Sequence, residues 1–424
     1  MNHTAEHNDE ELFLSDSSSE GDVNLKRRKI DETESFTDSD DDFSDWEDVP
    51  LNDPETLDSF NIIIDNSKGG QEVNKNRDKL RIAIENKQRR KSIHYLGMIS
   101  YMMHGFQRNK WLNSRELLKK LKKMLPESLI STRFKKYNRT LKKFRLAPTD
   151  ISLKNEVYSN FIYIVKYLIK WFRLNYKCNS NGLRVLGYLP WKSISSENMN
   201  DYFPDSSIPI NDLKGFISVA KQFKHNRDTG AQIFTALLRS LGFQTRLIFS
   251  LPLLPTNKNI KIQPKLDHEK LQRNKDFDLL YPYFWTEVIN PVDESEIFLI
   301  ENICFFEETK RFVRLKRFGG SNITKKNLSE YYTDIYFPLQ DQFNQMSMHY
   351  VVAMDNDNLI MDVSARYMSD ISYKWFNRLD LRTDFGKEAM LFQSMLRYLN
   401  IRNTYHSVNN KELDTLRKIA LLNY

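Results

Sequence analysis

The sequence has little of the chemistry on which secreted and membrane-spanning proteins depend. Its 424 residues include only two cysteines, Cys178 and Cys304, so at most one disulfide can form, and cysteines alone cannot build a structural zinc site. The apolar stretch at residues 161–172 is interrupted by Lys166 and Lys170, and falls short of the roughly 20 residues that cross a bilayer. The polar, acidic first residues lack the basic start and apolar centre of a signal peptide. These absences predict a protein of a reducing, intracellular compartment with no membrane partner.

Charge is distributed unevenly along the chain. The formal net charge is +7, but residues 1–60 hold 20 Asp and Glu against 4 Lys and Arg, a net of −16 that leaves +23 for the remainder. A body this basic favours polyanionic partners, and nucleic acid is the leading candidate because no lipid anchor accompanies it. A solvated basic surface without a partner is the alternative interpretation.

Residues 1–77 are predicted to be a disordered acidic tail, because they hold too little clustered apolar surface to offset the entropy of ordering them. One stretch of this tail resembles a nuclear import signal, although such short basic runs also arise by chance. Its four consecutive cations are Lys26, Arg27, Arg28 and Lys29.

A second stretch of the tail combines acid with aromatic residues. In "DSDDDFSDWEDVPL" (residues 38–51), Phe43, Trp46 and Val49 recur every three residues amid carboxylates. The carboxylates keep the peptide soluble and steer it toward a basic partner, while burial of a Trp side chain adds about 1.5–3 kcal/mol of affinity. We interpret the stretch as a docking peptide, with a merely solvating tail as the alternative.

Residues 78–210 are predicted to be helical and basic. Between Arg108 and Arg145 there are 14 Lys and Arg against 2 Glu, and aromatic residues interleave with the cations. Helical spacing lets the aromatics face a core while the cations face outward. The hypothesis is that the cations contact DNA phosphates; an ordinary charged helix face is the alternative. The outward cations are Lys135, Lys136, Arg139, Lys142 and Lys143.

Residues 211–400 alternate helix and strand signals. A helix that begins at Arg227 runs through a Gly242 turn into a strand, and two further β-rich segments follow at residues 282–289 and 295–306. This order resembles the transglutaminase-like core, an α+β fold shared with papain-like enzymes and peptide N-glycanases. In active members of that group, a Cys opens the helix, and a His and an Asp lie on the next two strands.

The resemblance places each catalytic position on a residue of another type. The "FTALLRSLGF" helix puts the nucleophile at Arg227, the "YFWTEV" strand puts the base at Tyr283, and "LIENI" puts the third group at Glu301. Arginine is no nucleophile at neutral pH, and tyrosine is a poor general base. His225 and Cys304 lie out of register with these positions, and Cys178 is interpreted as a packing residue. The sequence therefore predicts no enzyme, cofactor or metal; a peptide N-glycanase-like hydrolase is the runner-up.

Several stretches together resemble the xeroderma pigmentosum group C (XPC) family. They are the "HG…RN.W" pattern in residues 93–113, "DTGAQIFTALLRSLG", "PYFWTEVIN" at residues 282–290, and "HYVVAMDNDNLIMDVSARYM" at residues 349–368. The acidic peptide is similar to the family's docking peptide for the pleckstrin-homology domain of TFIIH. The resemblance implies a nuclear scaffold of nucleotide excision repair that grips duplex DNA and binds a shuttle protein with ubiquitin-like and ubiquitin-associated domains.

The C-terminal residues 401–424 are predicted to be a linker. In the family, three β-hairpin domains that sense the lesion follow the transglutaminase-like domain, and they are expected to begin about where this sequence stops. The resemblance implies a subunit of a DNA damage recognition complex, but this departure puts damage selectivity by the chain itself in doubt, whereas binding of undamaged duplex and of partners can remain. An adaptor that binds no DNA remains the third interpretation.

Overall fold

The computed structural model describes residues 70–180, 182–183, 188, 209–254, 256, 283–294, 296–301, 312–316, 350–367 and 384–401, and every structural statement below concerns those residues. The predicted import signal, the docking peptide, Cys304 and all of the C-terminal linker after residue 401 lie outside them. The chain divides into a unit Met1–Val73 and a unit Asn74–Tyr424. The second unit holds both the basic helical part and the strand-rich core.

The helical part opens with α1 (Gly70–Leu112), a helix of 43 residues that begins before the predicted tail boundary at residue 77. Helix α4 begins after Asp150, whose side chain accepts hydrogen bonds from the amides of Ser152 and Leu153 and caps the first turn. The further helices are α2 (Arg115–Met124), the π-helical segment η3 (Leu129–Phe134), α3 (Lys135–Leu146), α4 (Ile151–Asn175), α6 (Leu213–Gln222), α7 (Arg227–Ser240), α9 (Ser364–Tyr367) and α11 (Asp384–Asn400).

Six strands form one antiparallel sheet in the order β6-β5-β4-β3-β7-β8. Two more, β1 and β2, form a separate parallel pair. The segment Lys224–Asn226, between α6 and α7, is strand β2; three residues are too few to show an alternating pattern in the sequence. The strands are β1 (Lys177–Ser180), β2 (Lys224–Asn226), β3 (Thr245–Ser250), β4 (Phe284–Ile289), β5 (Glu296–Ile300), β6 (Phe312–Lys316), β7 (Val351–Met354) and β8 (Ile360–Asp362).

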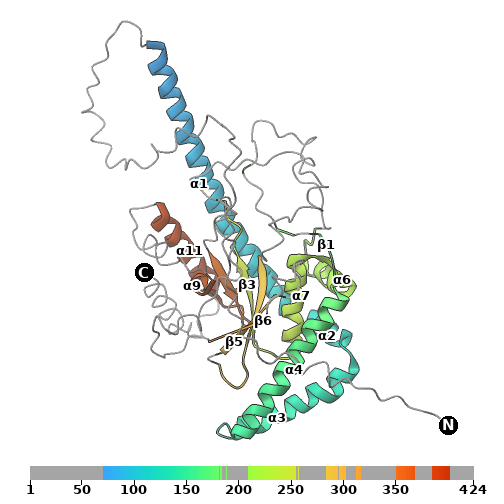
Figure 1. Cartoon of the computed structure of the whole chain (residues 1–424). Helices are drawn as coiled ribbons and strands as arrows, with labels where there is room; N and C mark the ends of the chain where they lie inside the picture. The colour runs from blue at the N-terminus through green and yellow to red at the C-terminus, as the bar shows by residue number, and fades with distance from the viewer. Residues whose placement is uncertain are drawn as a thin grey trace, which may run out of the picture. The chain divides into compact units, whose positions relative to one another are not determined.

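Helices cover both faces of the sheet (Figure 1). Thr286 of β4 shares a hydrogen bond of 2.8 Å with Thr235 of α7. The ring of Trp285, the preceding residue, packs edge-on against Tyr367 of α9 at a centroid distance of 4.9 Å. Because neighbouring residues of a strand point to opposite faces, α7 and α9 lie on opposite sides of β4.

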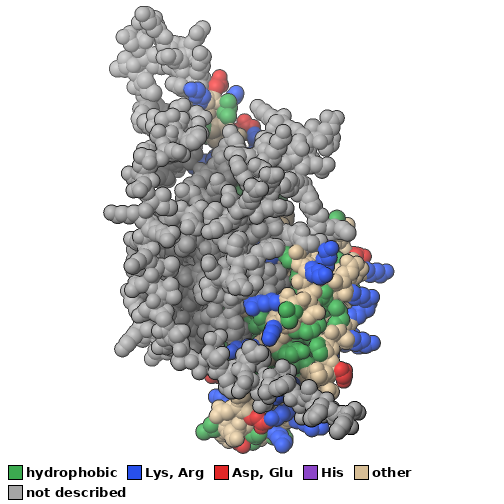
Figure 2. Space-filling model, turned by 45° about the vertical axis from the view of Figure 1, so that its right-hand side comes forward, with side chains coloured by type: hydrophobic (Ala, Val, Ile, Leu, Met, Phe, Trp, Pro, Cys, Tyr) green, Lys and Arg blue, Asp and Glu red, His purple; other side chains and the backbone are tan. Residues whose placement is uncertain are grey.

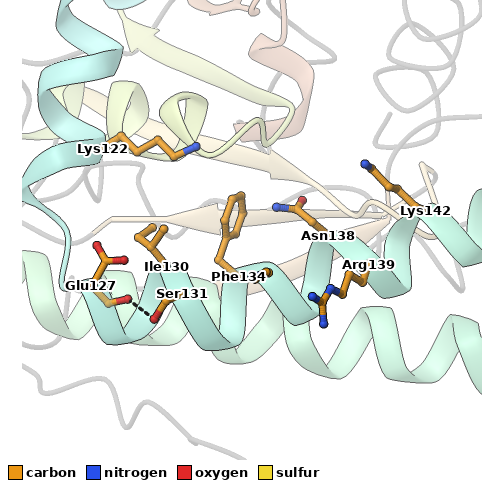
Figure 3. A pocket seen from close by; sticks show the side chains of 9 residues that line it. Lys122, Glu127, Ile130, Ser131, Phe134, Asn138, Arg139 and Lys142 are labelled. Carbon is orange, nitrogen blue, oxygen red and sulfur yellow. Dashed lines mark hydrogen bonds between the residues drawn. The ribbon is translucent and has the colours of Figure 1, made fainter.

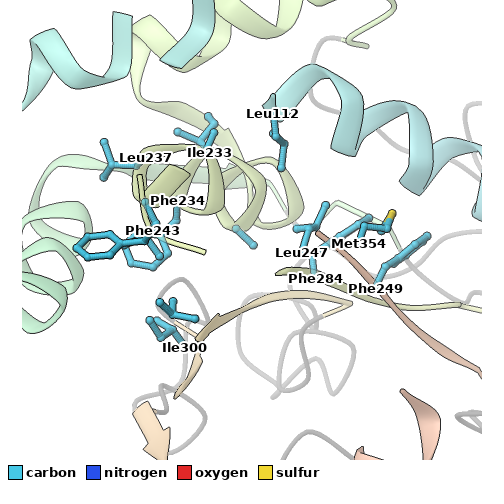
Figure 4. Packing of buried hydrophobic residues seen from close by; sticks show 14 of the residues in the cluster. Leu112, Ile233, Phe234, Leu237, Phe243, Leu247, Phe249, Phe284, Ile300 and Met354 are labelled. Carbon is cyan, nitrogen blue, oxygen red and sulfur yellow. The ribbon is translucent and has the colours of Figure 1, made fainter. Parts of the chain in front are cut away.

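The main core lies between α1, α4, α7 and one face of the sheet (Figure 4). Phe249 of β3 stacks on Phe284 of β4 at a centroid distance of 4.1 Å. A Cβ atom on Gly105 of α1 would lie 2.9 Å from Phe249, so only glycine lets this helix approach the sheet so closely. This explains the glycine in the "HG…RN.W" pattern.

The helical hairpin of α3 and α4 is fastened to the core by aromatic side chains. Phe243, which follows α7, lies 5.6 Å from the ring of Tyr137 in α3 and 5.5 Å from the ring of Phe161 in α4. Phe134 at the start of α3 contacts the same ring at 6.4 Å. Aromatic pairs at these distances contribute about 0.5–1.5 kcal/mol each beyond area burial. The position of α3 is therefore set by its packing on the strand-rich core.

Within the described part of the chain, no helix is long and apolar enough to cross a membrane. In the same residues, no group of three or more His, Cys, Asp and Glu side chains is placed to hold a metal ion.

Candidate functional site

Arg227 occupies the first position of α7, where the resemblance places a nucleophile. Asn226 caps the helix by accepting a hydrogen bond of 2.8 Å from the amide of Thr229. The side chain of Arg227 is buried, with 1% of its surface exposed. A cation at a helix N-terminus is disfavoured by the helix dipole and by desolvation, so it needs a compensating charge. Asp228 supplies one, with its Oδ1 atom 3.7 Å from Nε of Arg227.

The fold brings Arg227 and Tyr283 together. The guanidinium carbon of Arg227 lies 5.5 Å from the centroid of the Tyr283 ring, within the range of a cation–π contact. Tyr283 directly precedes β4, and Glu301 directly follows β5. The antiparallel register pairs Thr286 with Ile300, so Tyr283 and Glu301 lie at the same end of the β4–β5 pair. A positive charge under an aromatic ring is a structural contact, because neither group supplies a thiolate or a base.

Asp228 connects this cluster to the segment after β1. Its Oδ2 atom accepts a hydrogen bond of 2.6 Å from the amide of Leu183. Gly182 has a positive φ of 89°, and a Cβ atom there would lie 2.2 Å from Oδ2 of Asp228. Only glycine fits this close approach. The sequence reading did not single out Asp228, because its partner lies 45 residues away in the chain.

Arg108 adds a second cation near Asp228. Its guanidinium lies 4.7 Å from the ring centroid of Trp111 and 5.6 Å from that of Phe216, and it donates to the carbonyl of Ile210 at 3.3 Å. Burial lowers the pKa of Arg108 to about 10, and the carboxylate of Asp228 opposes that shift. The residue therefore stays charged at neutral pH.

The "HG…RN.W" pattern thus has a structural explanation at each position. Asn109 donates to the Asp355 carbonyl and to Oδ1 of Asn358 in the β7–β8 turn, at 3.0 Å each, and so ties α1 to the sheet. Burial, helped by the charge of Arg108, lowers the pKa of His104 to about 4, so this imidazole is neutral at physiological pH. The pattern was the signal that could have identified Arg108 as a partner of the α7 N-terminus.

Cys178 and His225 are neighbours that the sequence alone does not reveal. They stand opposite each other in the parallel pair β1–β2. Cys178 is a partly buried cysteine. Nδ1 of His225 lies 3.1 Å from Oγ1 of Thr229. Cys178 lies on a strand, whereas the thiol of a transglutaminase-like enzyme opens the helix, and Arg227 holds that position here.

All five cations predicted to face outward from α3 are exposed, and the interleaved aromatics Phe134, Tyr137 and Phe144 are buried. The pattern-based orientation of this helix is therefore confirmed. Nζ of Lys136 forms an ion pair with Oε1 of Glu156 at 3.3 Å. The sequence reading also missed cations of α2, among them Lys119, Lys122 and Lys123, which are exposed as well.

Two hollows lie along α3. The first has a volume of about 480 Å³, and Figure 3 shows Lys122 of α2 across it from Asn138 and Lys142 of α3, with Phe134 between them. The second, of about 450 Å³, is lined by Lys136, Lys143 and Glu156 among others. Lys135 and Arg139 line both. Lys and Arg side chains are also visible on the described part of the surface that Figure 2 shows. Such a surface can hold rows of phosphate groups.

Comparison with known proteins gives three curated relatives. The DNA repair protein RAD34 of Saccharomyces cerevisiae is 26% identical over 411 residues, which cover 90% of this chain and 55% of the relative. The DNA repair protein RAD4 of the same yeast is 24% identical over 307 residues, covering 72% and 35%. The DNA repair protein rhp41 of Schizosaccharomyces pombe is 23% identical, covering 80% and 54%. The chain spans about half or less of the length of these relatives.

The family model of the Rad4 transglutaminase-like domain matches residues 251–417, which include Tyr283 and Glu301 but not Arg227. Among solved structures, Rad4–Rad23 bound to a 6-4 photoproduct UV lesion superposes with a TM-score of 0.56 at 19% identity, covering 80% of this chain and 59% of the other. Rad4–Rad23 crosslinked to undamaged DNA gives a TM-score of 0.54. The predicted α+β transglutaminase-like fold is confirmed.

Proposed function

We propose that this chain is an XPC-family protein and a non-enzymatic DNA-binding scaffold of nucleotide excision repair, which grips duplex DNA through the exposed cations of α3. The proposal requires no cofactor and no metal. Its relatives named as DNA repair proteins, and the solved Rad4 structures that hold DNA, support this class of function.

The arrangement of α3 carries the proposal. Its aromatic face is locked against Phe243, so the opposite face presents five Lys and Arg side chains from a fixed position. Each cation that neutralises a phosphate releases condensed counterions, and log K then falls with log salt by about 0.9 per contact. Lys136 also pairs with Glu156, so four to five contacts are expected, with a slope of roughly −4.

The cluster at the α7 N-terminus supports the non-enzymatic part. The position that needs a thiolate holds a buried guanidinium, which lies under the ring of Tyr283 and beside Asp228. Loss of either partner would leave the other charge buried without a counter-charge, which would destabilise the fold. We therefore assign the pair of Arg227 and Asp228 a structural role.

Partners and location are proposed on the same likeness to the XPC family. We propose that the chain binds a shuttle protein with ubiquitin-like and ubiquitin-associated domains, and the solved assemblies of Rad4 with Rad23 support a partner protein for this fold. We further propose import into the nucleus through residues 26–29. Phe43, Trp46 and Val49 would dock on the pleckstrin-homology domain of TFIIH.

The DNA-binding proposal is tested by fluorescence anisotropy of a labelled, undamaged duplex titrated with the full chain between 50 and 200 mM salt. A slope near −4 predicts that affinity falls roughly 250-fold over this range. A pure adaptor would leave the anisotropy unchanged at every salt concentration. No binding at 50 mM would overturn the proposal.

The docking proposal has an independent test. The variant Phe43→Ala/Trp46→Ala should bind the isolated pleckstrin-homology domain of TFIIH roughly 100-fold or more weakly, since two aromatic side chains are no longer buried. Its affinity for duplex should not change. The matched control Phe36→Ala/Phe60→Ala removes two aromatics elsewhere in the tail and should bind like the unaltered chain. Equal affinity of the first variant and the control would refute docking through these residues.

A further inference from the structure

The hairpin of α3 and α4 ends in an exposed apolar tip, the sequence "RLAPTDI" at residues 145–151. Leu146 is 88% exposed and Ile151 is 73% exposed, the first being the highest value among the exposed large hydrophobic residues of the described chain. Ala147 and Pro148 between them are exposed as well. In Figure 1 the junction of the two helices lies at the lower end of the view.

The tip is held in one shape by backbone hydrogen bonds. The amide of Ala147 donates to the carbonyl of Lys143 at 3.1 Å, and the amide of Asp150 donates to the carbonyl of Ala147 at 3.2 Å. The carboxylate of Asp150 accepts from the amide of Ser152 at 2.8 Å, which caps α4. Pro148 has a fixed φ angle. The apolar side chains are therefore presented without a further cost of ordering the loop.

Positive charge surrounds the tip. Lys142, Lys143, Arg145 and Lys154 are all exposed, and the one acidic side chain in the turn, Asp150, is engaged as the cap. Charge complementarity therefore selects a polyanion as the occupant. Phosphate contacts alone would be served equally well by polar residues at positions 146 and 151, so the apolar pair calls for a partner that also offers apolar surface between its charges.

We propose that Leu146 and Ile151 form a wedge that enters a groove of duplex DNA and presses against the stacked bases, while the α3 cations hold the backbone beside it. Stacked bases offer apolar surface between two rows of phosphates, and Leu, Ile and Pro side chains are the types that proteins insert between base steps to unstack and kink a duplex. The inference rests on the proposed binding of duplex DNA. The inference goes beyond that proposal, because the chain would contact the bases as well as the phosphates and would bend the duplex.

An anionic lipid surface offers the same two chemistries, but it fits this tip less well. Stable membrane association uses a whole amphipathic helix face or a lipid chain in addition to basic residues. Here only two large apolar side chains project from a turn, and the buried sides of α3 and α4 are committed to the core. Duplex DNA is therefore the occupant that we argue for.

The test compares the full chain with Leu146→Ser/Ile151→Ser. The probe is a duplex that carries 2-aminopurine, whose fluorescence rises when its base unstacks. The unaltered chain should raise the fluorescence on binding. The variant should lose most of that rise and bind about tenfold more weakly, because two apolar side chains no longer leave water. The salt slope of the variant should stay unchanged, since its phosphate contacts remain.

Leu174→Ser is the matched control, because Leu174 is 76% exposed at the opposite end of α4. It should bind and unstack the duplex like the unaltered chain. If the Leu146/Ile151 variant keeps the full fluorescence rise and affinity, the wedge is refuted while the DNA-binding scaffold stands. If the unaltered chain binds no duplex, the scaffold itself fails and the wedge with it.

A vesicle-binding experiment distinguishes insertion into DNA from binding to an anionic lipid surface. Sedimentation with phosphatidylserine–phosphatidylcholine vesicles should leave the chain in the supernatant at 150 mM salt. Vesicle binding that disappears in Leu146→Ser/Ile151→Ser, together with duplex unstacking that does not, would overturn the proposal in favour of a membrane contact.

Discussion

Replacing Arg227 by methionine tests whether the position that the resemblance gives to a nucleophile holds a structural ion pair here. The side chain is 1% exposed, and its Nε atom lies 3.7 Å from the carboxylate of Asp228, which is itself buried. Removing one partner of a buried pair costs about 3–5 kcal/mol, because the other charge is left desolvated without its counter-charge. For a folded unit of this size, 1 kcal/mol corresponds to roughly 2 °C, so the melting temperature should fall by about 6–10 °C.

The assay is thermal unfolding followed by circular dichroism, with a double-mutant cycle. Asp228→Asn alone should also destabilise, and the double variant Arg227→Met/Asp228→Asn should be more stable than the sum of the two single costs predicts, by about 1–3 kcal/mol. Arg115→Met is the matched control, because Arg115 is likewise the first residue of a helix but is exposed. It should cost under about 0.5 kcal/mol. A loss of under 2 °C for Arg227→Met, or strict additivity in the cycle, would refute the reasoning.

Three further outcomes are expected. Burial alone would lower the pKa of His94, but its contact with Glu388 outweighs burial and raises the pKa. The protonated imidazole therefore adds stability below about pH 6.5, and this stability is lost as the pH rises through the folded-state pKa. The variant His94→Gln should flatten this alkaline fall in melting temperature. Arg239 donates to the side chains of Asn113 and Thr245 and to the carbonyl of Met354, so Arg239→Met should lower the free energy of unfolding by about 3 kcal/mol or more in a denaturant titration, and a change under 1 kcal/mol would contradict its role. Neither the unaltered chain nor Cys178→Ser should release glycan from denatured glycoprotein; release that depends on Cys178 would revive the hydrolase alternative.

Local patterns predicted the parts of this protein that depend on spacing along one element. The three- and four-residue spacing in residues 134–144 gave the outward direction of Lys135 and Arg139, and the "YFWTEV" pattern placed Tyr283 at the start of a strand, where it meets Arg227. The orientation of α3 follows from helical periodicity, which a single sequence carries, whereas the place of Tyr283 follows from the resemblance of its motif to a known fold.

Contacts between distant segments could not be read in the same way. Asp228 meets the amide of Leu183, and Cys178 stands opposite His225, only because β1 and β2 pair in parallel. Lys122 lines the same hollow as Lys142 because α2 and α3 pack on a shared core. Strand β2 itself is only three residues long, and so short a segment carries no periodic signal.

The most direct test of DNA binding through α3 compares two variants that lose the same charge. The quantity measured is the slope of log K against log salt for duplex binding. Lys135→Gln/Arg139→Gln removes the two cations that line both hollows, and Lys387→Gln/Arg397→Gln removes one exposed Lys and one exposed Arg from α11. If α3 is the surface that grips the duplex, the first variant should lose about 1.8 from the magnitude of the slope, and the second should lose nothing. Equal slopes in the two variants would contradict a DNA grip built on α3.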